Sequence, residues 1–127
     1  MIEQISRLLD HESFSALFAP GSRAELPIVG RFQHGGRMLA IAGQVDRLAV
    51  TGDSVLLADF KTNRAAPRRL ADVPPAYICQ LALYRGALLQ LYPHRAVRAA
   101  LIWTEIPDLM EISAAAMEDV LTTLTST

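Results

Sequence analysis

Two strand-like segments joined by a short turn constrain the fold of this chain more than any other feature. Met38–Val50 and Val55–Phe60 are rich in β-branched and apolar residues, and the turn between them is centred on Gly52-Asp53. If these two residues form a type II′ turn, which places glycine first, Asp46 lies opposite Asp59. Directly opposed residues share one face of the sheet, with Cβ atoms about 4.5–5.5 Å apart. The sequence therefore predicts a hairpin that holds two carboxylates together.

Two adjacent carboxylates in apolar strands repel each other, and burial raises that cost. A divalent cation removes the repulsion, and an oxygen-only ligand set suits Mg²⁺ or Mn²⁺ better than zinc. Lys61 is two residues beyond Asp59, so strand alternation places its side chain on the same face. Such a site could bind a phosphate and lower the pKa of a water molecule. The alternative is that Asp46 and Asp59 are two ordinary surface acids, and a register slip of one residue would separate them.

The charge of the chain favours local contacts with any nucleic acid. Its formal net charge is −1, so binding cannot depend on a generally basic surface. Eleven of the twelve basic residues are arginine, and Lys61 is the only lysine. An ammonium is a compact charge that can approach a single oxygen or a water closely, which a guanidinium does less well. Arg64, Arg68 and Arg69 could contact DNA phosphates, or could simply belong to a solvated loop.

The remaining segments predict one mixed α/β domain over residues 1–127. Pro75 suits the first turn of a helix, and Ser113 suits an N-cap. The order of elements is α, β-meander, α, β, α, which indicates a mixed central β-sheet flanked by helices. The expected elements are one or two short helices in Ile2–Phe18, strands at Glu25–Gln33, Met38–Val50, Val55–Phe60 and Val97–Thr104, a helix over about Ala76–Leu91, and a C-terminal helix through Leu124.

The composition indicates a cytoplasmic protein. The single cysteine, Cys79, cannot form an internal disulfide or a four-thiolate metal site, which favours a reducing compartment. No apolar run approaches the roughly 18 residues that span a bilayer, and the N-terminus lacks the features of a signal peptide. We therefore expect no contact with a membrane.

Three motifs follow one another in a specific order and spacing. They are Gly-X-X-Asp-Arg at Gly43–Arg47, Asp-X-Lys-Thr at Asp59–Thr62 and Gln-X-X-X-Tyr at Gln80–Tyr84. Together they resemble the PD-(D/E)XK nuclease superfamily, specifically the RecB-like nuclease domain at the C-terminal end of AddA-type helicase-nucleases of bacterial double-strand-break repair. The likeness extends from about Phe18 to Ile112.

The resemblance implies a restriction-endonuclease-like core and a metal-dependent exonuclease that hydrolyses DNA phosphodiester bonds. It makes Asp46 and Asp59 the metal-binding carboxylates and adds the main-chain carbonyl of Phe60 as a ligand. Lys61 would orient or activate the attacking water and offset charge in the transition state. The implied cofactor is Mg²⁺, with Mn²⁺ as a substitute.

The resemblance also implies residues that contact a single DNA strand. Gln80 and Tyr84 are four residues apart, so they lie on one face of the helix and both can reach the site. Thr62 and Arg64 follow the catalytic lysine and are expected on the DNA as well. The alternative for Gln80 and Tyr84 is the edge of an amphipathic helix.

The chain departs from the RecB-like pattern at its N-terminal end. Such domains carry an upstream helix with a metal-binding histidine, and no segment here is similar to it; His11, His34 and His94 are weak substitutes, and Glu25 is a candidate accessory acid. The motor motifs of a helicase are missing too. We therefore expect an N-terminally truncated fragment of a larger enzyme, in which ATP serves only the motor and an AddB-type subunit is the partner.

Two functions other than catalysis stay open. The chain could be a catalytically inactive nuclease fold that binds DNA or docks a partner. It could also be a small α/β domain in which the two acids are incidental. The second alternative would be favoured if Asp46 and Asp59 faced opposite sides of the sheet.

Overall fold

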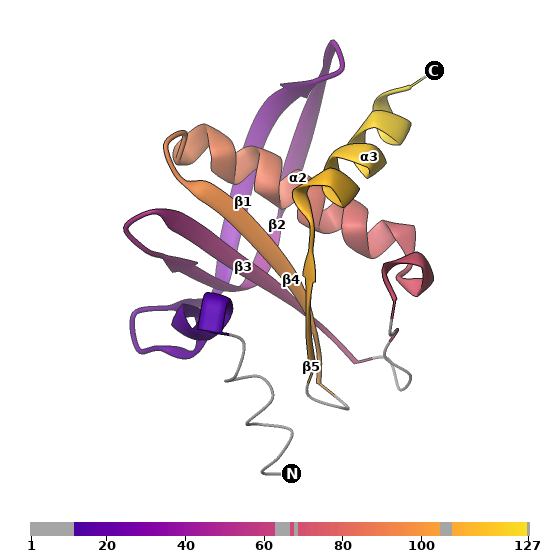
Figure 1. Cartoon of the computed structure of the whole chain (residues 1–127). Coiled ribbons are helices and arrows are strands. Elements are labelled where there is room, and N and C mark those ends of the chain that lie inside the picture. The colour runs from indigo at the N-terminus through magenta and orange to yellow at the C-terminus, as the bar shows by residue number, and fades with distance from the viewer. Residues whose placement is uncertain (1–11, 63–66, 68, 105–107, 127) are drawn as a thin grey trace.

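The computed structural model describes residues 12–62, 67, 69–104 and 108–126. A five-stranded sheet in the order β1-β2-β3-β4-β5 forms its centre, with helices α2 and α3 beside it (Figure 1). The elements are η1 (Glu12–Phe18), β1 (Arg23–His34), β2 (Arg37–Val50), β3 (Ser54–Lys61), η2 (Leu70–Asp72), α2 (Pro75–Leu91), β4 (Ala96–Trp103), β5 (Asp108–Ile112) and α3 (Ala114–Thr125).

The sheet is mixed, as the sequence predicts. Strands β1, β2 and β3 form an antiparallel meander, and β4 and β5 are also antiparallel. Only β3 and β4 are parallel, and α2 connects them. A parallel pair needs such a crossover, because its strands begin at the same edge of the sheet.

Two hydrophobic clusters, one on each face, hold the sheet. The first lies between the sheet and the helices α2 and α3, and the second lies between the sheet and η1. On β3 the residues alternate: Val55 and Leu57 belong to the first cluster, whereas Leu56 and Ala58 belong to the second. This alternation fixes which β3 side chains face α2.

The β1–β2 hairpin is the longest part of the sheet and extends beyond the other strands (Figure 1). It reverses at Gly35 and Gly36, whose φ angles are +58° and +77°. Positive φ at both central residues is the geometry of a type I′ turn, whose twist matches that of the flanking strands. Gly35 and Gly36 therefore form the turn between the two strands, and His34 is the last residue of β1.

The helix boundaries agree closely with the sequence. Helix α2 begins at Pro75 and ends at Leu91, and the Ser113 side chain caps α3 by accepting a hydrogen bond from the backbone N–H of Ala116 at 3.2 Å. The expected helical segment Ile2–Phe18 is described only from Glu12, where it is a 3₁₀ helix. No helix among the residues with described positions is long and apolar enough to cross a membrane.

One strand was missed by the sequence analysis. No strand was predicted after Thr104, yet Asp108 begins β5, which pairs with β4 at the edge of the sheet. The five residues of β5 are too few for a clear periodic pattern, so pairing with β4 rather than local preference decides their conformation.

Candidate active site

The β2–β3 hairpin has the register that the sequence predicts. Its pairs run from Val50 opposite Val55 to Arg47 opposite Ala58. Asp46 and Asp59 come directly after this last pair, and their side chains share a hydrogen bond. The Asp46 carboxylate also accepts a hydrogen bond from the backbone N–H of Phe60, with an N–O distance of 2.8 Å. The two acids therefore meet on one face of the sheet, and the alternative in which they face opposite sides is wrong.

The expected type II′ turn is wrong, even though the register is right. Gly52 does not have the positive φ that this turn requires at its first position. Instead, the backbone N–H of Ser54 donates to the Thr51 hydroxyl at 3.1 Å, and the N–H of Thr51 donates to the Ser54 carbonyl at 2.8 Å. The Thr51 carbonyl is bound by Nε of Arg95 at 2.9 Å. The Thr51 hydroxyl and the distant Arg95 thus bind backbone groups of the turn and stabilise it.

A break in strand alternation lies next to Asp46. Val45 and Leu48 both belong to the cluster on the α2 face, although an odd spacing should place them on opposite faces. The neighbouring strand is irregular at the same level: Glu25, which the register places opposite Asp46, has a φ of +54°. Irregularities of this kind are common next to active sites, where they redirect a side chain. Here the break lets Asp46 and Val45 both face α2.

Asp59 is the one buried charged residue among those the structure describes, with 6% of its surface exposed. Its pKa is raised, first by burial and then by a hydrogen bond with the Asp46 carboxyl, and the nearby Lys61 ammonium opposes this shift. Nζ of Lys61 lies 2.5 Å from Oδ2 of Asp59, a close ion pair without the geometry of a well-directed hydrogen bond. Among the described residues, one cation, Lys61, thus lies beside two acids.

Gln80 connects helix α2 to this cluster. Its side-chain carbonyl accepts a hydrogen bond from Nζ of Lys61 at 3.1 Å. Beside Lys61 an open groove of about 630 Å³ runs between β2 and α2. Ile41, Leu83 and Gln80 are among its lining residues. A substrate strand could therefore approach the lysine from this side.

Tyr84 was expected to contact DNA, but its ring is buried, with 3% exposed. Its hydroxyl donates to the Gln44 carbonyl and accepts from the Gln44 N–H, both at 3.1 Å. The approach requires glycine at position 43, where a Cβ would lie 2.5 Å from the Tyr84 hydroxyl oxygen. The close contact between Gly43 and Tyr84 accounts for the glycine in one motif and the tyrosine in the other. The bonds of Tyr84 to Gln44 attach α2 to β2, the strand that carries Asp46.

Arg47 has a role that the sequence analysis missed. Its Nε and Nη2 both donate to the carbonyl of Leu17, at 3.1 and 3.0 Å, and Nη2 also donates to the hydroxyl of Ser22 at 2.7 Å. The guanidinium therefore anchors η1 to the sheet directly beside Asp46. No local pattern marks this contact, because its partners lie 25 and 30 residues away.

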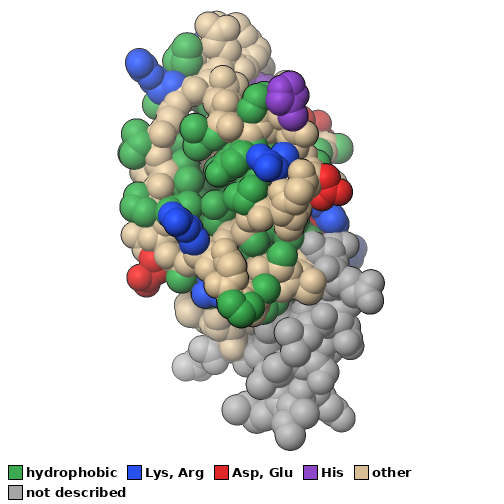
Figure 2. Space-filling view, turned by 90° about the vertical axis from the view of Figure 1, so that its left-hand side faces the viewer, with side chains coloured by type: hydrophobic (Ala, Val, Ile, Leu, Met, Phe, Trp, Pro, Cys, Tyr) green, Lys and Arg blue, Asp and Glu red, His purple; other side chains and the backbone are tan. Residues whose placement is uncertain are grey.

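Several other expected site residues are placed differently or not described. Thr62 follows Lys61 and is exposed, whereas Arg64, Arg68 and His11 lie outside the described residues. Arg69 forms an exposed ion pair with Asp72 at 3.3 Å. Around the hydrophobic centre of the face in Figure 2, basic and acidic side chains are scattered without a continuous basic strip. On that face, charge alone does not mark a DNA-binding surface.

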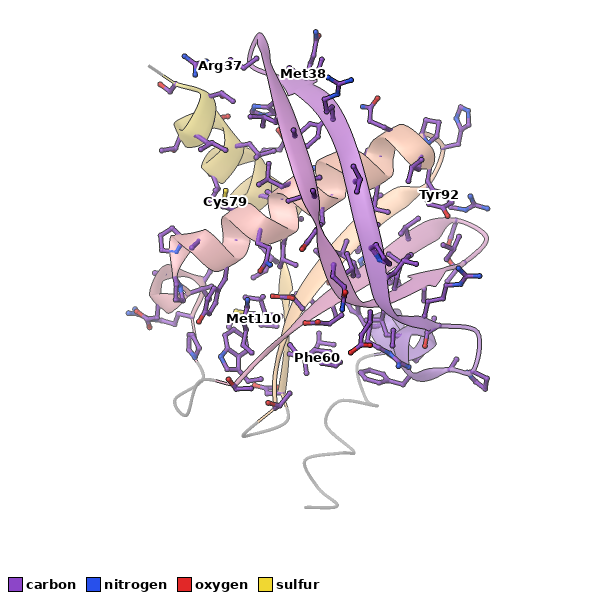
Figure 3. All side chains as sticks on the ribbon, turned by 180° about the vertical axis from the view of Figure 1, so that it is seen from behind. Arg37, Met38, Phe60, Cys79, Tyr92 and Met110 are labelled. Carbon is purple, nitrogen blue, oxygen red and sulfur yellow. The ribbon has the colours of Figure 1, made fainter. Side chains whose placement is uncertain are left out.

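The chemistry of the acid pair fits a divalent metal ion. Two adjacent carboxylate groups, one of them buried with a raised pKa, supply hard oxygen ligands and an uncompensated negative charge. The backbone of Phe60 lies beside them, at the end of the sheet away from the β1–β2 turn (Figure 3). No group of three histidine, cysteine or acidic side chains suited to a metal occurs within the described part of the chain.

Comparisons with known proteins identify the family of the chain. The family model of the PD-(D/E)XK nuclease superfamily matches residues 3–124. Among solved structures, one titled "Crystal structure of SSO0001" is similar over 99% of this chain, with a TM-score of 0.45 and 16% sequence identity. The match covers 60% of that structure's chain. The search of functionally curated proteins returns no match.

Proposed function

Because the chain belongs to the PD-(D/E)XK nuclease superfamily, we propose that it is a Mg²⁺-dependent DNA nuclease domain with its active site at Asp46, Asp59 and Lys61. The observation that carries the proposal is the acid pair, of which Asp59 is buried. Burial and the neighbouring Asp46 carboxyl raise the pKa of Asp59, so the protein holds an anionic site that is costly without a cation. Residues with perturbed pKa values cluster at functional sites.

Each residue has a distinct role in the proposed site. Asp46 and Asp59 would hold the metal, and the Phe60 carbonyl would supply a further ligand. The metal, when bound, lowers the pKa of a water molecule and stabilises the charge that develops on the phosphate. Lys61 orients the water and offsets that charge with its ammonium group. Gln80 keeps the ammonium directed into the site through its hydrogen bond.

The substrate of this domain is a single DNA strand. The groove is open to solvent and is lined by Lys61 and by residues of α2, which supports an extended strand that lies along this helix. Thr62 and Arg64, which follow Lys61 in the sequence, are proposed DNA contacts. Gln80 and Tyr84 both line this groove, and Tyr84 also attaches α2 to β2 through its bonds to Gln44.

The motifs also support an origin in an AddA-type helicase-nuclease of double-strand-break repair. In such an enzyme the nuclease domain cuts strands that the ATP-driven motor has separated. An AddB-type subunit is the proposed partner, and the bacterial cytoplasm is the proposed location. These assignments rest on the resemblance of the three motifs.

Alanine substitutions in the parent enzyme test the proposal. Asp59→Ala and Lys61→Ala should each abolish Mg²⁺-dependent cleavage of single-stranded DNA and leave ATP-driven unwinding intact. Asp53→Ala, which changes an exposed acid in the β2–β3 turn, serves as the matched control. Undiminished cleavage by both active-site variants would refute the assignment.

The second candidate function is an inactive nuclease fold that binds DNA or docks a partner. The observation that favours it is the small number of side-chain ligands: within the described residues only two acids meet at the site. Calorimetric titration with Mn²⁺ separates the two functions. An active site should bind Mn²⁺ in a way that depends on Asp46, whereas an inactive module should not.

A further inference from the structure

Lys61 is held by three different groups that come from two elements. The Asp59 carboxylate approaches Nζ along β3, and the Gln80 amide approaches it from α2. The third group is the ring of Tyr77, whose centroid lies 4.1 Å from Nζ. A cation over the face of an aromatic ring is attracted by the negative charge of its π-system. Lys61 is only 15% exposed, so water weakens these contacts little.

Tyr77 is well placed to hold a neighbouring group still. It lies in the first turn of α2, where its backbone N–H donates to the Pro74 carbonyl at 2.9 Å. Pro75, at the first helical position, restricts the backbone of this turn. Gln80 follows three residues later on the same helical face. One rigid helix face thus presents a ring and an amide to the ammonium.

The contact with Asp59 differs in kind from the other two. Asp59 is the carboxylate that the proposed function assigns to a metal, and a metal would compete with Lys61 for the same oxygens. A ring face and a side-chain amide are poor ligands for Mg²⁺. The contacts to Tyr77 and Gln80 can therefore persist when Asp59 is engaged elsewhere.

We propose that Tyr77 is a positioning residue for Lys61: its ring holds the ammonium at the entrance of the β2–α2 groove while Asp59 binds metal. The role of this contact in catalysis rests on the proposed nuclease function. The contact itself can be measured without an assay of activity. Because the aromatic ring makes the contact with the Lys61 ammonium, Tyr77→Phe should preserve this contact. An aliphatic residue at position 77 should abolish it.

Lysine-selective isotope labelling gives the first test, because Lys61 is the only lysine and its side-chain signals need no assignment. Protons above an aromatic ring resonate upfield of their usual position. The Lys61 Hε signals should be shifted upfield in the wild type and in Tyr77→Phe, both with and without Mg²⁺. They should return to ordinary values in Tyr77→Leu. Tyr92→Leu removes another ring that lies near a cation, Arg95, and should leave the Lys61 signals unchanged.

Steady-state cleavage of a single-stranded oligonucleotide gives the second test. Tyr77→Leu should lower kcat by about tenfold and change KM much less, because the loss concerns a group that acts in the transition state. Tyr77→Phe should restore most of kcat. Tyr92→Leu should cleave as the wild type does.

Three results would overturn the inference. The first is the absence of an upfield shift of the Lys61 signals in the wild type. This measurement does not depend on the folding of any variant. The second is a Tyr77→Leu variant with unchanged Lys61 signals and a raised KM, which would make Tyr77 a substrate contact. The third is a Tyr77→Phe variant as impaired as Tyr77→Leu. If the shift is present but wild-type protein cleaves no DNA, the contact stands and the proposed nuclease function fails.

Discussion

Two charged clusters in this molecule have opposite compositions. The site cluster, Asp46, Asp59 and Lys61, has two acids and one cation and is mostly buried. The surface cluster has a single acid, Glu118 on α3, whose carboxylate binds His34 at 2.9 Å and Arg85 at 3.0 Å. The Glu118 side chain is 49% exposed. One cluster has excess negative charge in a low-dielectric setting, and the other surrounds its acid with donors in water.

The pKa values of the two acids differ in the direction that this contrast implies. Burial and the Asp46 carboxyl raise the pKa of Asp59, whereas the hydrogen bond from His34 lowers the pKa of Glu118, with a further contribution from Arg85. A charged Asp59 is therefore less favourable in the folded chain than in the unfolded chain, and a charged Glu118 is more favourable. The comparison indicates that the surface cluster serves the fold, whereas the site cluster lowers stability and is suited to a cation.

The largest expected effect is on metal affinity. Asp46→Asn and Asp59→Asn should each weaken Mn²⁺ binding by more than about a hundredfold, since even the loss of an outer-shell partner costs about 10–100-fold. Glu118→Gln should bind Mn²⁺ as the wild type does. Isothermal titration calorimetry measures all four proteins. Equal loss of binding in Glu118→Gln would remove the distinction between the clusters.

A second, smaller effect concerns thermal stability without divalent cations. Asp59→Asn should melt about 2–5 °C above the wild type at about pH 8 in the presence of a chelator. With its pKa raised, the contribution of Asp59 to stability is full below its ordinary pKa and is lost as the pH rises through the folded value. The difference should therefore vanish in acid.

Saturating Mg²⁺ should reverse this order, because only the wild type gains stability from the bound ion. Differential scanning calorimetry with and without Mg²⁺ makes the comparison. A wild type that is already the more stable protein in chelator would show that the acid pair is not costly.

The pH dependence of the surface cluster should have the opposite sign. The lowered pKa of Glu118 gives stability that is present above its ordinary pKa and is lost as the pH falls through the folded value. Because Glu118 is half exposed, Glu118→Gln should cost no more than about 1 kcal/mol at neutral pH. Urea unfolding of the wild type and of Glu118→Gln at a series of acidic pH values measures this difference. The free energies of unfolding of the two proteins should converge as the pH falls. A gap that widened in acid would contradict the assignment.

The smallest expected effect is that of salt. The cost of Glu118→Gln should shrink as NaCl is raised, since an exposed pair is screened. The stability difference of Asp59→Asn in chelator should change less, because Asp59 is buried. Glu111→Gln, which breaks the exposed ion pair with Arg98, is a matched surface control. Equal salt sensitivity of all three differences would mean that burial does not separate the clusters.

The sequence was sufficient for the features that depend on local patterns. The strands and helix α2 follow from periodicity and from Pro75, and the opposition of Asp46 and Asp59 follows from counting outward from a two-residue turn. The register held even though the turn type was wrong. Arg95 and the Thr51 hydroxyl stabilise a different turn of the same length, and length alone sets the pairing.

The features that were missed depend on contacts between distant parts of the chain. The hydroxyl of Tyr84 binds Gln44, which is 40 residues away, and no pattern in α2 predicts that it would be buried. The break in alternation that turns both Val45 and Asp46 toward α2 likewise arises where two strands are irregular together. Sequence motifs identified these residues as a group but could not separate those that face the substrate from those that hold the fold.

The central claim is that Asp46 and Asp59 form a divalent metal site, and a crystal soaked in Mn²⁺ tests it most directly. The account predicts an anomalous scattering peak bonded to an oxygen of each carboxylate, with Lys61 still beside the Tyr77 ring. A peak elsewhere on the molecule, with the acid pair unchanged at a saturating concentration of Mn²⁺, would contradict it.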